Sequence, residues 1–208
     1  MARLSRQATG SLFEVANEDR LLTVPNALSV LRLACVPVFV WLLFGRDNRA
    51  GAALLLAALG ATDWVDGYIA RHFDQVSTVG KVLDPAADRV LLVVAVVATL
   101  IDGSVPAALG WLVLVREVVV SVAVLALAAA GARRIDVQWA GKAGTLALMF
   151  ALPLFLLGHD QHVGGRHVAT TLGWAFAVPG LVLAWYAAIS YVPRARIALG
   201  EGRVGSHP

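Results

Sequence analysis

Apolar residues occur along this chain in long runs, not in the alternating pattern that is typical of β-strands. Six of these runs are close to the length of about 20 residues that a helix needs to cross a bilayer. Backbone groups exposed to lipid have no hydrogen-bond partner there, so each run is predicted to be a helix. The predicted spans are 26–45, 50–72, 82–102, 106–131, 139–158 and 168–191.

The composition supports lipid as the main solvent. Of the 208 residues, 59% are hydrophobic and 15% are charged, and the mean hydropathy is +0.74. A soluble domain usually carries about 25% charged residues. The chain is therefore predicted to be an all-α integral membrane protein. Cys35 is the single cysteine, which excludes a disulfide framework.

The positions of the basic residues predict the orientation of the helices. Twelve of the 17 Lys and Arg side chains lie on one side of the six spans and only three on the other. The three are Arg46, Arg49 and Arg166. By the positive-inside rule, the N- and C-termini are both expected in the cytoplasm, and the chain is expected in the plasma (inner) membrane. The basic residues form no cluster that would suit a nucleic acid, so no nucleic-acid partner is expected.

The chain divides into three parts. Residues 1–21 are expected to be a cytoplasmic segment, with an amphipathic helix and a frayed terminus as equal alternatives. Residues 22–192 form the predicted six-helix domain. Residues 193–208 are rich in glycine and are expected to be a disordered cytoplasmic tail.

Four aspartates lie at the expected cytoplasmic end of the second and third spans. Residues three or four positions apart share one face of a helix. Asp63 and Asp66 therefore share a face of the second span, and Asp84 and Asp88 share a face of the third. A turn of about ten residues allows the two helices to pack antiparallel, so the four carboxylates are predicted to meet.

Four carboxylates in a partly dehydrated pocket repel one another unless a cation compensates them. Oxygen ligands favour Mg²⁺ or Mn²⁺, and two such ions could bind a diphosphate and support phosphoryl transfer. Gly67 and Gly80 leave space where a nucleotide would approach the backbone, and Arg71 is placed to complement a phosphate.

These residues resemble the signature of the CDP-alcohol phosphatidyltransferase family, D-x-x-D-G-x-x-A-R-x8-G-x-x-x-D-x-x-x-D, which they match at every fixed position. The segment Pro25 to Arg32, PNALSVLR, is similar to the opening of that family's first helix. The likeness covers roughly residues 22–192 and includes the six-helix topology.

The resemblance implies a function for most of these residues. Asp63, Asp66 and Asp84 would bind metal, and Asp88 would bind metal and act as general base on an acceptor hydroxyl. The CDP group would be bound by Asn26, Gly67, Ala70, Arg71 and Gly80. The reaction would transfer a phosphatidyl group from CDP-diacylglycerol to an alcohol at the cytoplasmic surface and release CMP. The resemblance also implies a homodimer.

The acceptor is expected to be an anionic, glycerol-type alcohol, bound by Arg32, Arg116 and Lys142. Arg116 interrupts an apolar helix, which indicates an anionic partner; the alternative is an internal pair with Glu117 or with an aspartate of the metal site. Lys142 could instead extend to the membrane interface. Two branches of the family fit: cardiolipin synthases, which use phosphatidylglycerol, and phosphatidylglycerophosphate synthases, which use glycerol 3-phosphate. The segments Gly141 to Thr145, Leu148 to Pro153 and Gly173 to Phe176 resemble actinobacterial cardiolipin synthases most.

Two other classes of membrane protein fit the sequence less well. An ion-coupled transporter would not need the Gly67, Arg71 and Gly80 framework, and the six spans show no repeat. An intramembrane prenyltransferase would carry two separate Asp-rich motifs. His159, His162 and His167 are interpreted as surface histidines of one loop, without a catalytic role.

Overall fold

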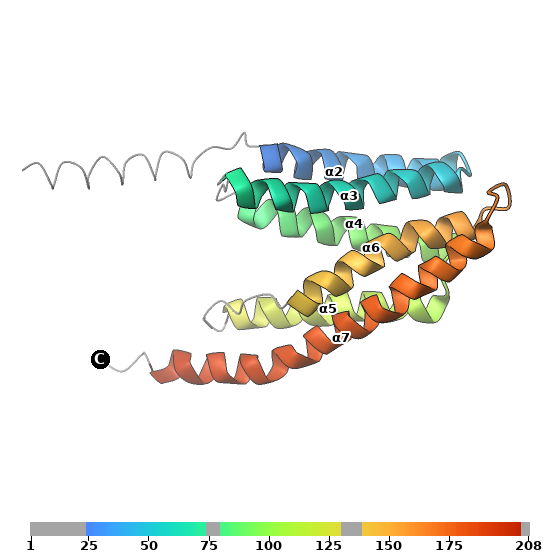
Figure 1. The fold of residues 1–208 in the computed structure, drawn as a ribbon. Coiled ribbons are helices and arrows are strands. Elements are labelled where there is room, and N and C mark those ends of the chain that lie inside the picture. The colour runs from blue at the N-terminus through green and yellow to red at the C-terminus, as the bar shows by residue number, and fades with distance from the viewer. Residues whose placement is uncertain (1–23, 74–79, 130–138, 205–208) are drawn as a thin grey trace, which may run out of the picture.

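The structure is a computed structural model that describes residues 24–73, 80–129 and 139–204. Side chains are described for all of these except residues 24–26, 63–73, 80–85, 127, 128 and 191–204. The described chain is entirely helical, as predicted (Figure 1). Its elements are α2 (Val24–Val40), the π-helical turn η1 (Trp41–Gly45), α3 (Arg49–Phe73), α4 (Gly80–Asp102), α5 (Ala107–Ala129), α6 (Trp139–His159) and α7 (Arg166–Val204).

The observed helices follow the predicted apolar runs to within a few residues at most ends. Four of them contain segments long and apolar enough to cross a membrane, among the residues that the structure describes. These segments are Ala27–Gly45, Ala107–Ala126, Trp139–His159 and Arg166–Ser190. A shorter apolar stretch, Arg49–Thr62, belongs to α3. The chain is therefore a helical membrane protein.

The last helix differs from the expected tail. α7 continues to Val204, whereas the sequence predicts an irregular segment from residue 193. The extension contains arginine, alanine and leucine, which have high helix propensity, and this outweighs the two glycines at positions 200 and 202.

Local signals explain several helix ends. Asn48 caps α3, because its Oδ1 atom accepts a hydrogen bond of 2.7 Å from the Gly51 backbone N–H. Asp47, just before it, has a φ of 48°, in the left-handed region that aspartate tolerates better than most residues. α4 ends at Asp102, and the next residue, Gly103, has a φ of 79°, which suits the position after a helix C-terminus. Gly165, with a φ of 86°, directly precedes α7.

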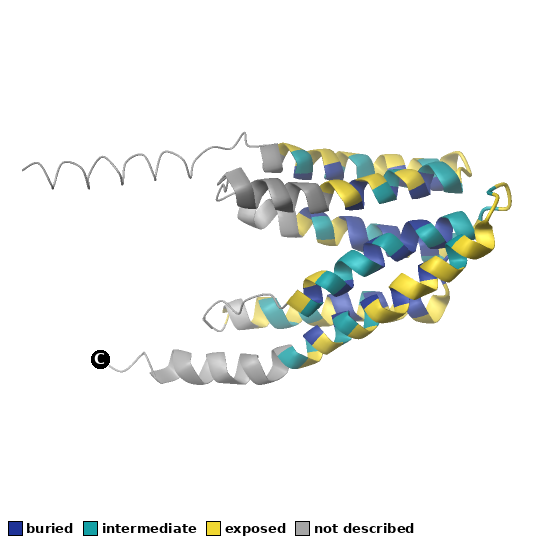
Figure 2. Ribbon diagram, viewed as in Figure 1, coloured by how far each residue is buried: buried dark blue, intermediate teal, exposed yellow. Residues whose placement is uncertain are grey.

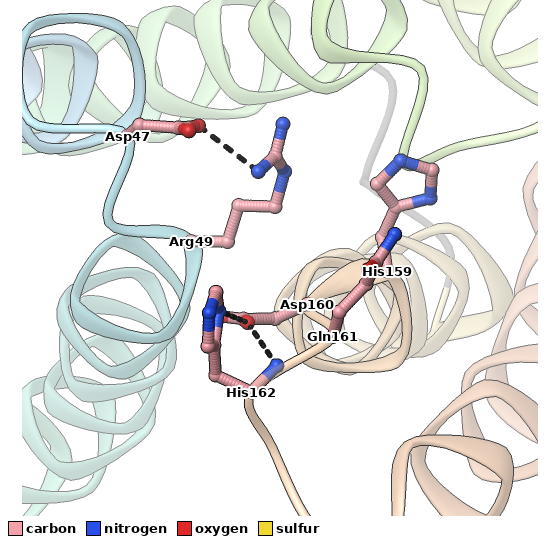
Figure 3. Close-up of a pocket in the computed structure, with 6 residues that line it drawn as sticks. All are labelled: Asp47, Arg49, His159, Asp160, Gln161 and His162. Atoms are coloured by element: carbon pink, nitrogen blue, oxygen red, sulfur yellow. Dashed lines mark hydrogen bonds and ion pairs between the residues drawn. The ribbon is translucent and has the colours of Figure 1, made fainter.

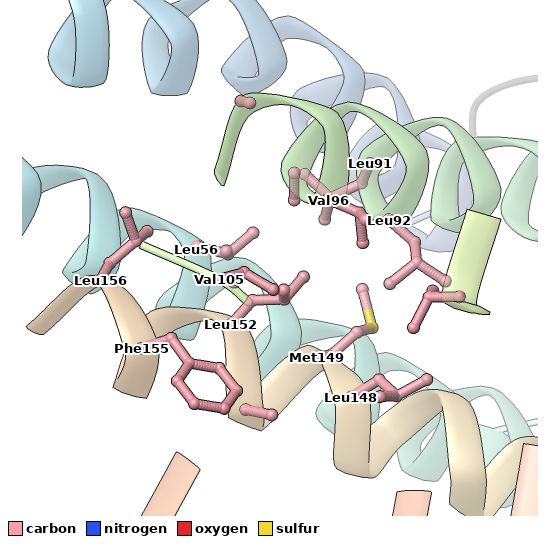
Figure 4. Packing of buried hydrophobic residues seen from close by; sticks show 14 of the residues in the cluster. Leu56, Leu91, Leu92, Val96, Val105, Leu148, Met149, Leu152, Phe155 and Leu156 are labelled. Carbon is pink, nitrogen blue, oxygen red and sulfur yellow. The ribbon is translucent and has the colours of Figure 1, made fainter. Parts of the chain in front are cut away.

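The core lies between α3, α4 and α6, with contributions from α2, α5 and α7 (Figure 4). α4 supplies buried residues at the spacing of one helix face: Ala87, Leu91, Ala95, Val96 and Thr99. α6 supplies the facing surface, and its labelled side chains in Figure 4 are Leu148, Met149, Leu152, Phe155 and Leu156. The buried Thr99 hydroxyl donates to the Ala95 carbonyl at 2.8 Å, so it leaves no unpaired polar group.

Helices α6 and α7 pack closely because both present glycine or alanine to the contact. A Cβ atom added to Gly144 would lie 2.7 Å from the backbone N of Ala184 and 2.8 Å from the carbonyl O of Gly180. Only glycine fits there, as in close helix pairs of membrane proteins generally.

Many large apolar residues are exposed on α2, α5 and α7. Figure 2 shows the exposed positions of these helices in yellow. On α5 these include Trp111, Val118, Val122 and Leu125, each about 60–70% exposed. A surface of this kind is expected where helices face lipid tails. Trp139, at the first position of α6, is 78% exposed.

Candidate functional site

The backbone places the four predicted aspartates on two consecutive helices. Asp63 and Asp66 belong to the last part of α3, and Asp84 and Asp88 to the first part of α4. α3 ends at Phe73 and α4 begins at Gly80, so the two pairs flank one short connection. The i, i+3 and i, i+4 spacings on helices are thus confirmed. The convergence of the carboxylates involves side chains outside the described residues and stays a prediction.

The residues predicted to bind CDP are placed only by their backbone. Gly67, Ala70 and Arg71 belong to α3, Gly80 begins α4, and Asn26 belongs to the first turn of α2. Their side chains lie outside the described part of the chain, so their contacts stay predictions.

Asp88 is the one predicted metal ligand whose side chain is described, and it forms an ion pair with Arg32 of α2. The Arg32 Nη1 atom donates to Oδ1 of Asp88. The Arg32 side chain is only 3% exposed, whereas that of Asp88 is 30% exposed. A buried guanidinium needs a compensating charge, and here the carboxylate supplies it. Arg32, predicted to bind the acceptor, therefore lies directly beside the predicted general base.

The second buried ion pair joins Arg116 and Glu117 of α5, which are 8% and 5% exposed. The Arg116 Nη1 atom donates to Oε1 of Glu117, and Nε lies 3.4 Å from the Ala184 carbonyl oxygen of α7. The internal pair with Glu117, one of the alternatives for Arg116, is therefore present. It uses Nη1 and leaves Nη2 without an acceptor among the described residues.

Nη2 of Arg116 faces the first turn of α6. A Cβ atom added to Gly141 would lie 3.8 Å from it. Lys142, the next residue, is exposed. The structure therefore brings Arg116 and the start of α6 together, with Lys142 exposed next to Gly141. Arg32, the third residue predicted to bind the acceptor, pairs with Asp88 of α4.

The opposite end of the bundle carries a polar cluster that the sequence analysis did not assign to any site (Figure 3). A hollow of about 190 Å³ is lined by Asp47, Arg49, His159, Asp160, Gln161 and His162. Arg49 forms ion pairs of 2.9 Å with Asp47 and with Asp102 at the end of α4. In the sequence, this end of the bundle is marked only by charged and polar residues between the predicted spans, such as Asp102 and Ser104.

The same cluster contains two of the three loop histidines. The pKa of Asp160 is lowered, chiefly because its carboxylate accepts a 2.9 Å hydrogen bond from the His162 backbone N–H. Within the described ranges, no group of three or more His, Cys, Asp or Glu side chains is arranged to hold a metal ion. His159, His162 and His167 are all exposed, which agrees with their interpretation as surface residues.

The comparison with known families decides the class of this protein. The profile that describes the CDP-alcohol phosphatidyltransferases matches residues 22–189, from the start of the first span to the last. The chain belongs to the CDP-alcohol phosphatidyltransferase family. It is therefore a phosphotransferase of phospholipid biosynthesis, as the resemblance of its aspartate motif to the family signature implied.

Curated relatives of this phosphatidyltransferase fall in two groups. It is 42% identical over 183 residues to the cardiolipin synthase (CMP-forming) of Streptomyces coelicolor, covering 86% of this chain and 85% of the relative. A putative cardiolipin synthase of Mycobacterium tuberculosis is 34% identical over 177 residues, covering 85% and 84%. A probable phosphatidylglycerophosphate synthase of the same species is 32% identical over 192 residues, covering 90% and 88%. Both predicted branches are thus represented among the relatives.

Proposed function

We propose that this phosphatidyltransferase makes cardiolipin by transferring the phosphatidyl group of CDP-diacylglycerol to phosphatidylglycerol, with release of CMP. The higher identity to a CMP-forming cardiolipin synthase than to the phosphatidylglycerophosphate synthase supports this acceptor. The observation that carries the proposal is Arg116, a buried guanidinium whose Nη2 edge is not bound by any described residue. That edge is suited to an acceptor that carries its own phosphate.

The charge around Arg116 supports an anionic acceptor. A helix N-terminus carries a partial positive charge and free backbone N–H groups. The first turn of α6 and the Arg116 guanidinium lie together, and Lys142, an exposed residue of the same turn, adds a further positive charge. A phosphate between these groups would be attracted by all three.

Glycerol 3-phosphate is the second candidate acceptor, and one observation favours it. The identity to a probable phosphatidylglycerophosphate synthase extends over 192 residues, slightly more than the match to the cardiolipin synthase. Both acceptors carry a glycerol hydroxyl and a phosphate, so both satisfy the chemistry around Arg116.

Asp63, Asp66, Asp84 and Asp88 would hold two Mg²⁺ or Mn²⁺ ions. The donor set fits, because carboxylate oxygens are the preferred ligands of these hard cations. When bound, the ions would neutralise the diphosphate of CDP-diacylglycerol and stabilise the leaving CMP. Asn26, Gly67, Ala70, Arg71 and Gly80 would bind the CDP group from the ends of α2, α3 and α4.

Asp88 would act as the base in the transfer. It accepts the proton of the acceptor hydroxyl, whose oxygen forms a bond to the phosphorus that bears diacylglycerol. The bond from this phosphorus to the CMP oxygen breaks, and CMP leaves with the electron pair. Arg32, which already binds one carboxylate oxygen of Asp88, would keep this base oriented toward the acceptor hydroxyl. In this proposal Arg32 lies near the hydroxyl, and the acceptor phosphate is bound elsewhere, at Arg116.

The membrane arrangement is part of the proposal. All six helices would span the plasma membrane, with both termini and the aspartates in the cytoplasm. The excess of basic residues at that end supports this orientation. A homodimer, as the family resemblance implies, is also proposed.

The test supplies purified full-length protein in lipid nanodiscs with CDP-diacylglycerol, Mg²⁺ and one acceptor at a time, and measures CMP and the lipid product by mass spectrometry. Cardiolipin formed only with phosphatidylglycerol is the expected result. Product only with glycerol 3-phosphate would select the second candidate. No CMP release with any alcohol would contradict the proposed function itself.

A further inference from the structure

Glu117 lies beside Arg116 in the chain, yet helix geometry does not favour their contact. Neighbouring side chains on a helix point about 100° apart and do not face each other. Here both are buried, and the Glu117 carboxylate nevertheless accepts from Nη1 of Arg116. Both side chains must therefore be turned toward the same space by the packing of the helices around α5.

The Arg116 guanidinium is held on two of its edges. Glu117 accepts from Nη1, and the Ala184 carbonyl of α7, 3.4 Å away, is positioned to accept from Nε. These two contacts come from different helices, so they fix the rotation of the planar group as well as its position. The remaining edge, Nη2, is directed toward Gly141.

Neutralising Arg116 would not by itself require this arrangement. A carboxylate at any other edge of the guanidinium would compensate the free-energy cost of burying the Arg116 charge equally well. The observed contact instead uses the side of the guanidinium that leaves Nη2 available. Gly141 places no side chain against that edge; a Cβ there would be in van der Waals contact with Nη2, at 3.8 Å, and with the Ala187 Cβ, at 3.4 Å.

We propose that Glu117 is a positioning residue for the transfer reaction: it orients Arg116 so that Nη2 binds an anionic phosphate oxygen of the acceptor. This inference rests on the proposed role of Arg116 in acceptor binding. The phosphate belongs either to the lipid headgroup of phosphatidylglycerol or to free glycerol 3-phosphate, and the chemistry of the contact is the same for both.

The experiment compares Glu117→Gln and Glu117→Ala with the wild-type enzyme in nanodiscs, measuring kcat and KM for the acceptor and, separately, KM for CDP-diacylglycerol. Both acceptors are assayed. A hydrogen bond to a charged group is worth enough to predict a rise of about 10- to 100-fold in acceptor KM for Glu117→Ala. Glu117→Gln keeps an oxygen that accepts from Nη1, so a smaller rise of a few-fold is expected. The KM for CDP-diacylglycerol should stay unchanged in both.

Asp102→Asn is the matched control, because Asp102 is also a buried carboxylate, with a side chain 4% exposed, paired with an arginine. Asp102 is the last residue of α4 and lies next to Arg49, in the polar cluster at the opposite end of the bundle from the aspartates. This variant should lower the unfolding temperature without changing acceptor KM. An equal rise in acceptor KM in this control would show general loosening of the bundle and would overturn the proposal.

A double-mutant cycle tests whether Glu117 acts through Arg116. The effects of Arg116→Ala and Glu117→Ala on acceptor KM should be strongly non-additive, because removing Arg116 leaves nothing for Glu117 to orient. Additive effects, an unchanged acceptor KM in Glu117→Ala, or a parallel rise in the KM for CDP-diacylglycerol would each overturn the proposal. If Glu117→Ala does not fold, Glu117→Gln decides: an unchanged acceptor KM there overturns it. Failure of the wild-type enzyme to use either acceptor would contradict the proposed function instead.

Discussion

The regions around Arg32 and Arg116 solve the same problem in different ways. Each places a guanidinium inside an apolar helix bundle and compensates it with a carboxylate. Arg32 is paired with Asp88, 56 residues away on another helix, whereas Arg116 is paired with the residue that follows it. The Arg32 pair therefore ties α2 to α4. The Arg116 pair stays within α5 and reaches another helix only through the Ala184 carbonyl.

This difference separates the two steps of the proposed reaction. A pair that includes the general base controls proton removal, so changes there should appear in kcat. A guanidinium with an edge left for a ligand controls binding, so changes there should appear in acceptor KM. The variants below test or sharpen this distinction, from the largest expected effect to the smallest.

The largest effect is expected for Asp88→Asn. The amide cannot accept the hydroxyl proton, and it removes the charge partner of Arg32, so kcat should fall by about 100-fold or more. Binding of CDP-diacylglycerol, measured by calorimetry, should persist. Turnover at the wild-type level would exclude Asp88 as the base.

The next largest effects are expected when Arg32 and Arg116 are each replaced by lysine. Lysine keeps the charge but loses the planar fork that allows several contacts to be held at once. Arg116→Lys should raise acceptor KM by about tenfold with kcat nearly unchanged, whereas Arg32→Lys should lower kcat by about tenfold with acceptor KM nearly unchanged. Steady-state kinetics of the two variants make the comparison. Identical kinetic changes in both would remove the distinction between the two regions.

Gly144→Ala should disturb the Arg116 region alone. The added Cβ would meet the backbone of Gly180 and Ala184 at less than 3 Å. Because backbone cannot move aside cheaply, α6 and α7 should separate, at a cost of about 1–3 kcal/mol in the free energy of unfolding. Thermal unfolding in detergent should show a decrease of several degrees.

Gly164→Ala is the control for this variant, because a Cβ at Gly164 meets nothing within 4 Å. Its unfolding temperature should match that of the wild type. An equally stable Gly144→Ala would mean that α6 and α7 do not approach as closely as the structure shows.

The smallest effect concerns the polar cluster at the other end of the bundle, which belongs to neither arginine pair. The pKa of Asp160 is lowered in the folded protein, so its contribution to stability is present above the carboxyl's ordinary pKa near 4 and is lost as the pH falls through the lowered value. This contribution should be no more than about 1 kcal/mol. Unfolding temperatures of the wild type and Asp160→Asn, compared between pH 6 and pH 3, should converge at the acid end. A constant difference across this range would contradict the assignment.

The sequence predicted the helices well because long apolar runs and charged breaks carry that signal directly. It predicted the aspartate pairs on α3 and α4 because their spacing depends only on helix geometry. It could not predict that Arg32 pairs with Asp88, since the contact depends on how α2 packs against α4. The contact between Arg116 and the Ala184 carbonyl could not be predicted either. Every residue has a carbonyl, and nothing in the sequence distinguishes the one that accepts from Arg116.

The position of Trp139 bears on how an acceptor would reach the enzyme in the proposed membrane arrangement. Exposed tryptophans prefer the boundary between lipid headgroups and acyl chains, so we expect Trp139, 78% exposed, to hold the start of α6 at that depth. Gly141 lies about 3 Å further along the helix axis, and Nη2 of Arg116 lies beside it. The guanidinium, although it is the tenth residue of α5, would then lie just below the headgroup layer. The proposed lipid acceptor would present its phosphate there by lateral diffusion, with its acyl chains still in the bilayer.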